Sequence, residues 1–221
     1  MSLYSPTAFE ADTASGLTLI EEHSFGILIV PHIDASQPPM VAHLPFILDR
    51  PGRRLLCHVA RANPIWQRCV TGNVVALAVF RGPHAYISPR WYTAPQKSVP
   101  TWNYTAVHVT GMPTIVSDDE LAAIVTKLSS HHESTVSLVP TAHDTPLKTV
   151  AGPWTPAAMP PSLLATMLHA IVGLALPLTA VETKHKLSQN RSRSDQRSVA
   201  AALAQQANAD ARGTAALMAR L

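Results

Sequence analysis

Charged residues are scarce in this sequence. Asp, Glu, Lys and Arg make up 14% of the 221 residues, against about a quarter in an average soluble domain. The net charge is +3, and so small an excess does not by itself indicate binding to nucleic acid. A chain with few charges and 47% hydrophobic residues often covers apolar surface in an oligomer or at a ligand site.

Long hydrophobic runs and cysteine pairs are also absent. No run approaches the length of a membrane span, and Met1 to Glu22 lacks the basic start and apolar middle of a secretory signal. The two cysteines, Cys57 and Cys69, have no second pair or His partner at a zinc spacing. We therefore expect a cytoplasmic protein with reduced thiols and no membrane segment.

Several motifs of catalysis and metal binding are missing. The eleven histidines include no HExxH and no paired Cys/His spacing, so we expect no metal site. No G-x-S-x-G is present, which argues against a hydrolase of that class. No G-x-G-x-x-G follows a predicted strand, which argues against a Rossmann dinucleotide site.

The most informative stretch runs from Val41 to Trp66. It predicts a hairpin with a turn at Asp49–Gly52 and a second arm over Arg54–Ala60. The arm ends in a polar cluster of His58, Arg61 and Asn63, and Pro64 disfavours helix at Asn63. A cation with amide donors suits an anionic ligand such as a phosphate. A hairpin that ends in a solvated loop is the alternative.

The rest of the chain predicts further strands and several short helices. Ser117 followed by Glu120 is a capping box that begins a helix, and Thr141 to Pro161 reads as a proline-rich loop. Most connections between strands are too short for a crossover helix, which favours an antiparallel sheet, and strands that are apolar throughout favour a small closed barrel. The other predicted strands are Phe25–Pro31, Val74–Phe80, Ala85–Ser88, Thr101–Gly111 with a continuation to Val116, and Ile171–Val181; the other predicted helices lie within 8–22, 64–68, 163–169 and 197–221.

Two more polar clusters sit at strand ends. One contains Trp102 and Asn103, and the other runs from Lys184 to Arg191. In the second cluster Lys186 can neutralise a phosphate, although a solvated basic tail is the alternative. Trp102 can face a planar ring, although a lone Trp on a strand is more often part of a core.

Six motifs together resemble one family. In chain order they are HLPFILD, HVARANPIW, FRGPHAYISPRWY, VPTWNYTAVHVTG, HHE and KLSQNR. The sequence resembles the PaiB family of FMN-binding negative transcriptional regulators over about His43 to Arg191. The resemblance implies a mainly β fold with flanking helices (α+β), an antiparallel split β-barrel of the pyridoxamine-phosphate-oxidase and flavin-reductase type. It also implies a homodimer with FMN at the subunit interface.

The resemblance also implies a set of cofactor-binding residues. Arg61 is our choice for the phosphate of FMN. One departure concerns His185, which stands where the family usually has an aromatic residue before the lysine of KLSQNR. The residues implied to line the FMN site are His58, Ala60, Arg61, Asn63, Trp102, Asn103, Lys186, Ser188 and Gln189.

We predict a split-barrel FMN-binding domain over 1–190 and a helical extension over 191–221. The expected function is an FMN-binding negative transcriptional regulator that acts as a homodimer. An FMN-dependent oxidoreductase using NAD(P)H is the main alternative, and an interaction protein with a vestigial site is another. Direct DNA binding has little support, because no helix-turn-helix is evident and the basic run Lys184–Arg197 is short. The flavin would itself supply the redox chemistry, so we name no catalytic acid or base.

Overall fold

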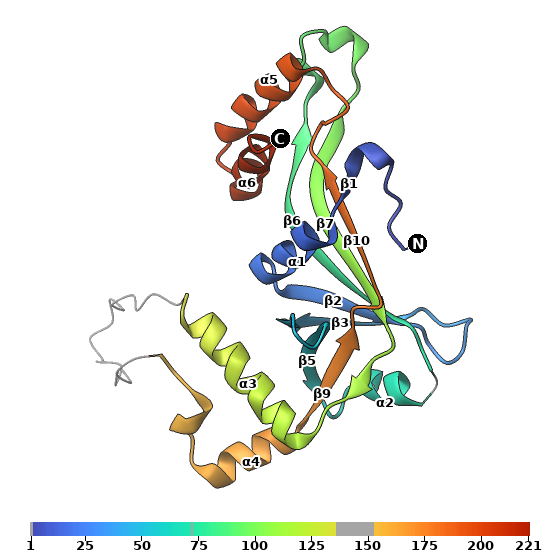
Figure 1. Ribbon diagram of the computed structural model, residues 1–221, viewed down its shortest axis with the longest axis vertical. Helices are drawn as coiled ribbons and strands as arrows, with labels where there is room; N and C mark the ends of the chain where they lie inside the picture. Colours follow the sequence, from blue (N-terminus) through green and yellow to red (C-terminus); the bar gives the residue numbers. More distant parts are fainter. Residues whose placement is uncertain (1, 72, 136–152) are drawn as a thin grey trace. The chain divides into compact units, whose positions relative to one another are not determined.

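The chain forms two compact units. The computed structural model describes residues 2–71, 73–135 and 153–221 (Figure 1). Unit 1 comprises Met1–Ile27, Leu77–Thr110 and Thr179–Leu221, and unit 2 comprises Leu28–Ala76 and Gly111–Leu178. Each unit is therefore assembled from segments that lie far apart in the sequence.

The strands form two sheets, with orders β1-β10-β7-β6-β2-β3 and β4-β5-β9-β8. Strand β10 pairs antiparallel with both β1 and β7. In the second sheet, β5 pairs antiparallel with β9. The predicted mainly β, antiparallel class with flanking helices is thus confirmed, although the described strands form two sheets and no closed barrel. The strands are β1 (Glu10–Ala11), β2 (Phe25–Val30), β3 (Met40–Pro45), β4 (Ile47–Asp49), β5 (Arg54–Ala60), β6 (Ala76–Ile87), β7 (Thr101–Gly111), β8 (Thr114–Ile115), β9 (Ile171–Pro177) and β10 (Ala180–Lys186).

The helices begin at polar or proline residues that favour helix starts. The Ser117 hydroxyl accepts a hydrogen bond from the Glu120 N–H at 3.2 Å, as the capping box predicts. No helix in the described part of the chain is both long and apolar enough to cross a membrane. The α-helices are α1 (Thr13–Glu22), α2 (Ile65–Val70), α3 (Asp118–Glu133), α4 (Pro161–His169), α5 (Arg193–Ala204) and α6 (Ala209–Met218), and short 3₁₀ turns occur at Thr7–Phe9, Pro89–Trp91, Pro95–Lys97 and Pro156–Ala158.

In unit 1, α1, α5 and α6 cover one face of the strands β6, β7 and β10 (Figure 1). Ala85 and Ile87 of β6 and Leu187 after β10 are buried against apolar residues of α5 and α6. The opposite face carries the N-terminal segment, where the Lys184 ammonium donates to the carbonyl of Tyr4 at 2.6 Å. Because successive side chains of a strand point to opposite faces, the two faces of this sheet offer different surroundings to neighbouring residues.

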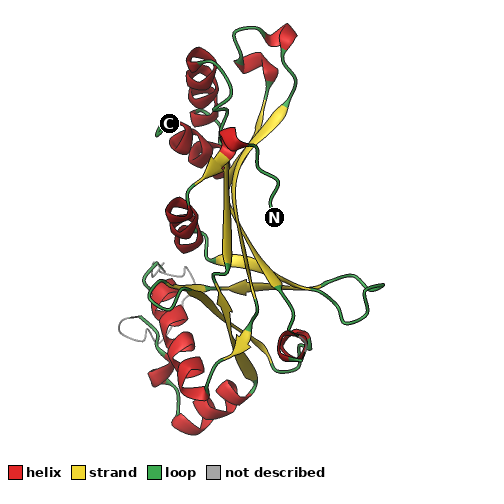
Figure 2. Cartoon of the chain, turned by 45° about the vertical axis from the view of Figure 1, so that its right-hand side comes forward, coloured by secondary structure: helices red, strands yellow, loops and turns green. Residues whose placement is uncertain are grey.

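In unit 2, β5 and β9 pair along their whole lengths, from Arg54 opposite Pro177 to Ala60 opposite Ile171. The α3 helix packs its apolar face on these two strands (Figure 2). Leu121, Ile124 and Leu128 of α3 are buried in one cluster with Leu56 of β5 and Ala175 of β9. Strand β5 is thereby held along one edge by β9 and on one face by α3.

Three predictions of strand boundaries are wrong. The predicted strands Val74–Phe80 and Ala85–Ser88 are parts of one strand, β6 (Ala76–Ile87), which continues through Pro83. Ile171–Val181 contains the end of β9 and the start of β10, which lie in different sheets. The segment after Gly111 does not continue β7, because β8 pairs with β9.

Two other predictions have partial outcomes. Residues 141–152 of the predicted loop lie outside the described residues, and Pro156–Ala158 forms a 3₁₀ turn. The segment predicted as a C-terminal extension forms α5 and α6, which belong to unit 1. Its status as a separate domain stays a prediction.

Candidate functional site

The residues implied to bind the cofactor form two clusters. His58, Ala60, Arg61 and Asn63 lie in unit 2, and we call them the β5 cluster. Trp102, Asn103, Lys186, Ser188 and Gln189 lie in unit 1, and we call them the β10 cluster. The structure brings residues together within each cluster, as follows.

Arg61 closes the end of β5. Its N–H donates to the carbonyl of Ala170 at 2.8 Å. Its guanidinium donates from Nε to the carbonyl of His169 at 2.6 Å and from Nη2 to that of Ile171 at 3.0 Å. A guanidinium has five N–H donors, so these contacts orient the group and leave donors for an anion. The side chain is exposed.

Asn63 shapes the loop that follows Arg61. Its N–H donates to the carbonyl of Ala60 at 2.9 Å, and its side-chain oxygen accepts from the N–H of Ile65 at 3.0 Å. The Trp66 indole donates to the carbonyl of Arg61 at 2.9 Å. The loop between β5 and α2 therefore has a defined backbone, as a ligand-binding loop requires, and Asn63 uses its carbonyl oxygen for that purpose.

His58 supplies an unpartnered polar atom. It pairs with Gly173 of β9 and is half-buried, and its Nδ1 is buried without a hydrogen-bond partner in the described part of the chain. Burial lowers the pKa of His58 below its usual 6.5, so the imidazole is neutral at pH 7. A buried polar atom without a partner costs stability and points to a missing ligand or water.

Lys186 is held beside Trp102 in the β10 cluster. Its ammonium donates to the Thr101 hydroxyl at 2.5 Å and to the carbonyl of Trp102 at 2.7 Å. Burial lowers the pKa of Lys186, and the neighbouring Lys184 lowers it further. The positive charge of Lys186 is thus fixed at the backbone of an aromatic residue.

Trp102 presents an aromatic surface to solvent, with 51% of the residue exposed. Its indole stacks on His84 with ring centroids 5.9 Å apart and an interplanar angle of 19°. The Tyr86 ring meets it edge-on at 6.2 Å. These rings line a pocket of about 320 Å³ together with Trp91 and residues of α5 and α6, a volume at the lower end for small-molecule sites.

Asn103 and Ser188 are buried and bond to each other. The Asn103 amide donates to the Ser188 hydroxyl at 3.0 Å and lies 3.4 Å from the Met218 sulfur. Gln189 closes the turn after β10, since its amide donates to the carbonyl of His185 at 2.5 Å and its oxygen accepts from the N–H of Leu187. These three residues shape the KLSQNR turn, and their direct contact with FMN stays a prediction.

Sequence reasoning did not assign His84 and Tyr86 to a site. They alternate along β6 within the motif FRGPHAYISPRWY, and this period of two, next to a strand that carries Trp102, was an available signal. No group of three or more metal-ligating side chains occurs among residues 2–71, 73–135 and 153–221.

In unit 1, the exposed Trp102 and the ammonium of Lys186 suit an aromatic ring and an anion, and in unit 2 the oriented guanidinium of Arg61 suits an anion. Comparison with known proteins identifies the family of the chain. A family model described as "Putative FMN-binding domain" matches residues 3–180. "Protease synthase and sporulation protein PAI 2" of Bacillus subtilis (strain 168) is 32% identical over 219 residues, which cover 98% of this chain and 96% of that protein.

Solved structures share the fold at low sequence identity. The conserved hypothetical protein Rv2991 of Mycobacterium tuberculosis superposes with a TM-score of 0.58 at 9% identity, over 86% of this chain and 95% of that one. The flavocytochrome Anf3 of Azotobacter vinelandii superposes with a TM-score of 0.53 at 10% identity, over 79% of this chain and 67% of that one. The predicted split-barrel fold and, at the level of the family, the predicted FMN cofactor are thereby confirmed. This chain belongs to the FMN-binding domain family and to its PaiB branch.

Proposed function

We propose that this protein is a homodimeric FMN-binding regulator, in which the β5 cluster of one subunit and the β10 cluster of its partner hold one FMN. The observation that carries the proposal is the pairing of Lys186 with Trp102, where an ammonium lies 2.7 Å from the carbonyl of a half-exposed tryptophan. FMN combines a planar ring system with a phosphate dianion, so it needs an aromatic or apolar surface together with cations. The bound flavin would supply redox chemistry, and the protein supplies binding and orientation.

Each cluster has a distinct part in the proposal. Arg61 contributes guanidinium donors to the phosphate, because its contacts to His169 and Ile171 already orient the group. Lys186 contributes a second positive charge, and Trp102 contributes a surface for stacking. The unpartnered Nδ1 of His58 is available to a polar atom of the ring edge.

The first test is retention of flavin by the purified protein. We expect the wild-type protein to keep a flavin absorption spectrum after incubation with FMN and gel filtration. Arg61→Ala and Lys186→Ala should each weaken FMN binding by about tenfold or more, since each removes a charge-assisted hydrogen bond. Arg197→Ala, which removes an exposed cation of α5, is the matched control and should bind as wild type.

A mixed dimer tests the sharing of the site between subunits. Coexpression of Arg61→Ala and Lys186→Ala subunits with different tags gives a heterodimer with one intact and one doubly altered site. We expect about half of the wild-type flavin content with wild-type affinity at the intact site. Uniformly weak binding at every site would contradict the sharing of clusters between subunits, and a monomer in solution would contradict the dimer.

The same samples separate regulation from enzymatic turnover. Rapid loss of the flavin's visible absorbance on anaerobic addition of NADH or NADPH would favour the oxidoreductase alternative. A regulator instead requires a partner, and DNA is the first to try. In the run Lys184–Arg197, Lys184 is buried, Lys186 donates to Thr101 and Trp102, and Arg191 packs on the Tyr92 ring. Arg193 and Arg197 are the exposed cations of this run. DNA binding through these two cations would show a slope of log K against log[salt] of roughly −2 per subunit.

A further inference from the structure

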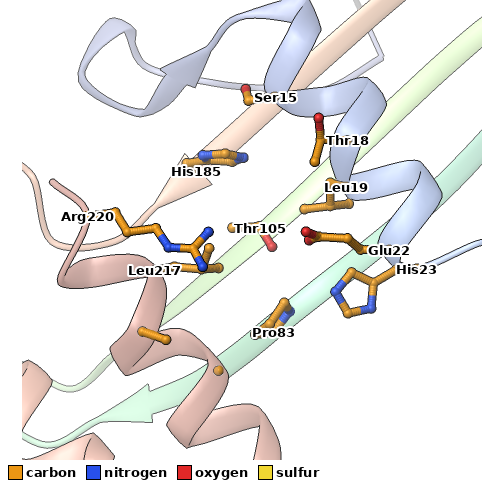
Figure 3. A pocket seen from close by; sticks show the side chains of 12 residues that line it. Ser15, Thr18, Leu19, Glu22, His23, Pro83, Thr105, His185, Leu217 and Arg220 are labelled. Carbon is orange, nitrogen blue, oxygen red and sulfur yellow. The ribbon is translucent and has the colours of Figure 1, made fainter.

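A second pocket of about 420 Å³ lies within unit 1, between α1, α6 and the strands beneath them (Figure 3). Its walls are largely apolar, with Leu19 from α1, Leu217 from α6 and Pro83 from β6. Thr105 of β7 and His185 of β10, which are register partners, lie on the strand side. Because side chains alternate along a strand, His185 points to the opposite face of the sheet from Lys186. None of the nine residues implied above to bind FMN lines this pocket, although Asn103 lies on the same sheet face as Thr105.

The strand side of the pocket carries two polar atoms without partners. Thr105 is fully buried, and its hydroxyl has no hydrogen-bond partner among the described residues. The Nε2 atom of His185 is likewise buried and without a partner in this part of the chain. Burial lowers the pKa of His185, partly offset by Asp12, so the neutral ring offers one donor and one acceptor. Buried polar atoms of this kind are normally satisfied by a ligand or an ordered water.

The rim of the pocket carries two opposite charges. Arg220, two residues after the end of α6, extends into it, and Glu22 of α1 extends into it from the other side (Figure 3). Both side chains are exposed, and neither forms an ion pair or side-chain hydrogen bond with another residue that the structure describes. A ligand that carries both a carboxylate and an ammonium would match them.

We propose that this pocket binds a small amino-carboxylate, such as an α-amino acid, whose side chain ends in a hydroxyl or amide. The carboxylate pairs with Arg220 and the ammonium with Glu22. The body of the ligand packs on Leu19 and Leu217, and its polar tip bonds to Thr105 and His185. The pocket volume of about 420 Å³ lies within the range found for small-molecule sites.

The test uses the full-length protein, saturated with FMN or free of it, and matched probes. L-Tyrosine and L-glutamine are titrated by calorimetry and by saturation-transfer NMR. Tyramine lacks the carboxylate of tyrosine, 3-(4-hydroxyphenyl)propionate lacks its amine, and L-phenylalanine lacks its hydroxyl. We expect tyrosine, glutamine or both to bind. Each of the three tyrosine analogues should bind about tenfold or more weakly than tyrosine, since each has lost one hydrogen-bonding group.

Variants assign each end of the ligand to a residue. Arg220→Met should abolish the preference for tyrosine over tyramine. Glu22→Gln should abolish the preference for tyrosine over 3-(4-hydroxyphenyl)propionate. Thr105→Val keeps the shape of the side chain and should abolish the preference for tyrosine over phenylalanine. Thr183→Val is the matched control, because Thr183 also has a buried, unpartnered hydroxyl on this sheet face but does not line the pocket.

Two results would overturn the proposal. One is no binding of tyrosine or glutamine at millimolar concentration to a folded protein, which would leave water as the occupant. The other is binding that Arg220→Met, Glu22→Gln and Thr105→Val all leave unchanged. Both outcomes are independent of the FMN proposal, because flavin retention is read from the absorption spectrum of the same samples.

Discussion

Ser188 adopts a positive φ of 66° while its hydroxyl bonds to the buried amide of Asn103. A residue with a Cβ is strained in this left-handed region, and glycine is not. The hydroxyl, in contrast, can be supplied only by Ser or Thr. The serine of KLSQNR thus combines a conformational cost with a polar contact, and both belong to the turn that follows Lys186.

Two substitutions separate these contributions. Ser188→Ala removes the hydroxyl and keeps the strain, so it should lower the free energy of unfolding by about 1–3 kcal/mol, because the Asn103 amide loses its partner. Ser188→Gly also removes the hydroxyl but relieves the strain, and should be more stable than Ser188→Ala by about 1 kcal/mol. Chemical denaturation of both variants measures the difference. Equal stabilities would show that the left-handed backbone costs nothing here.

The motifs in the sequence identified the family correctly, but they did not predict the contacts that each side chain makes. Arg61 and Lys186 are charged and stand in motifs, so their chemistry is evident from their identity. Asn103 is buried, and it contacts Ser188, which is 85 positions away, and Met218 of α6, which is 115 positions away. Such long-range packing leaves no mark in the local pattern, so the sequence could not assign the bond.

At the level of elements, α1 packs closely on β10 at Gly16. A Cβ on Gly16 would overlap the Thr183 hydroxyl, so the glycine permits the approach of the helix to the strand. The contact is buried, since Gly16 and Thr183 are both buried. The position of α1, and with it one wall of the pocket in Figure 3, therefore depends on the smallest side chain.

A double-mutant cycle tests this close approach. Gly16→Ala should destabilise the protein by about 1–3 kcal/mol through overpacking, despite the better helix propensity of alanine. In the Thr183→Ala background the same change should cost much less, because the overlapping hydroxyl is gone. Thermal unfolding of the four proteins gives the coupling energy, and purely additive effects would contradict the contact.

Strand boundaries were predictable where the pattern is purely local. Arg54–Ala60 and Thr101–Gly111 match β5 and β7 residue for residue. The sequence predicts a strand boundary at Pro83 and a continuous strand through Pro177, and both predictions are wrong. Pro83 is accommodated within β6, whereas Pro177 does end β9 and the chain then enters the other sheet. Whether a proline breaks a strand depends on whether its position needs an N–H for pairing, which only the topology decides.

At the level of the whole molecule, three half-buried histidines make stability depend on pH. Burial lowers the pKa of His58, His108 and His185, and Glu182 and Ser2 partly offset this at His108. In the unfolded chain each histidine takes up a proton near its ordinary pKa of 6.5, whereas the folded protein does so only at lower pH. The unfolded state thus binds more protons just below pH 6.5, and stability falls as the pH falls through this range.

We expect the urea midpoint to decrease between about pH 7.5 and pH 5, before the carboxylates titrate. His185→Phe should make this decrease less steep, because one of the three groups no longer titrates. His43, whose side chain is exposed, serves as the matched control, and His43→Phe should change this slope less than His185→Phe does. A wild-type profile that is flat over this range would contradict the prediction.

The two cysteines are both buried as free thiols. Burial raises the pKa of Cys57, with a smaller contribution from Cys69, and it raises the pKa of Cys69 to about 11. Since the thiolate is the reactive form, both native sulfurs should resist maleimide dyes at neutral pH. A single cysteine introduced on the surface would then be the one position labelled, so the wild-type background is ready for fluorescence energy transfer between the subunits of the proposed dimer.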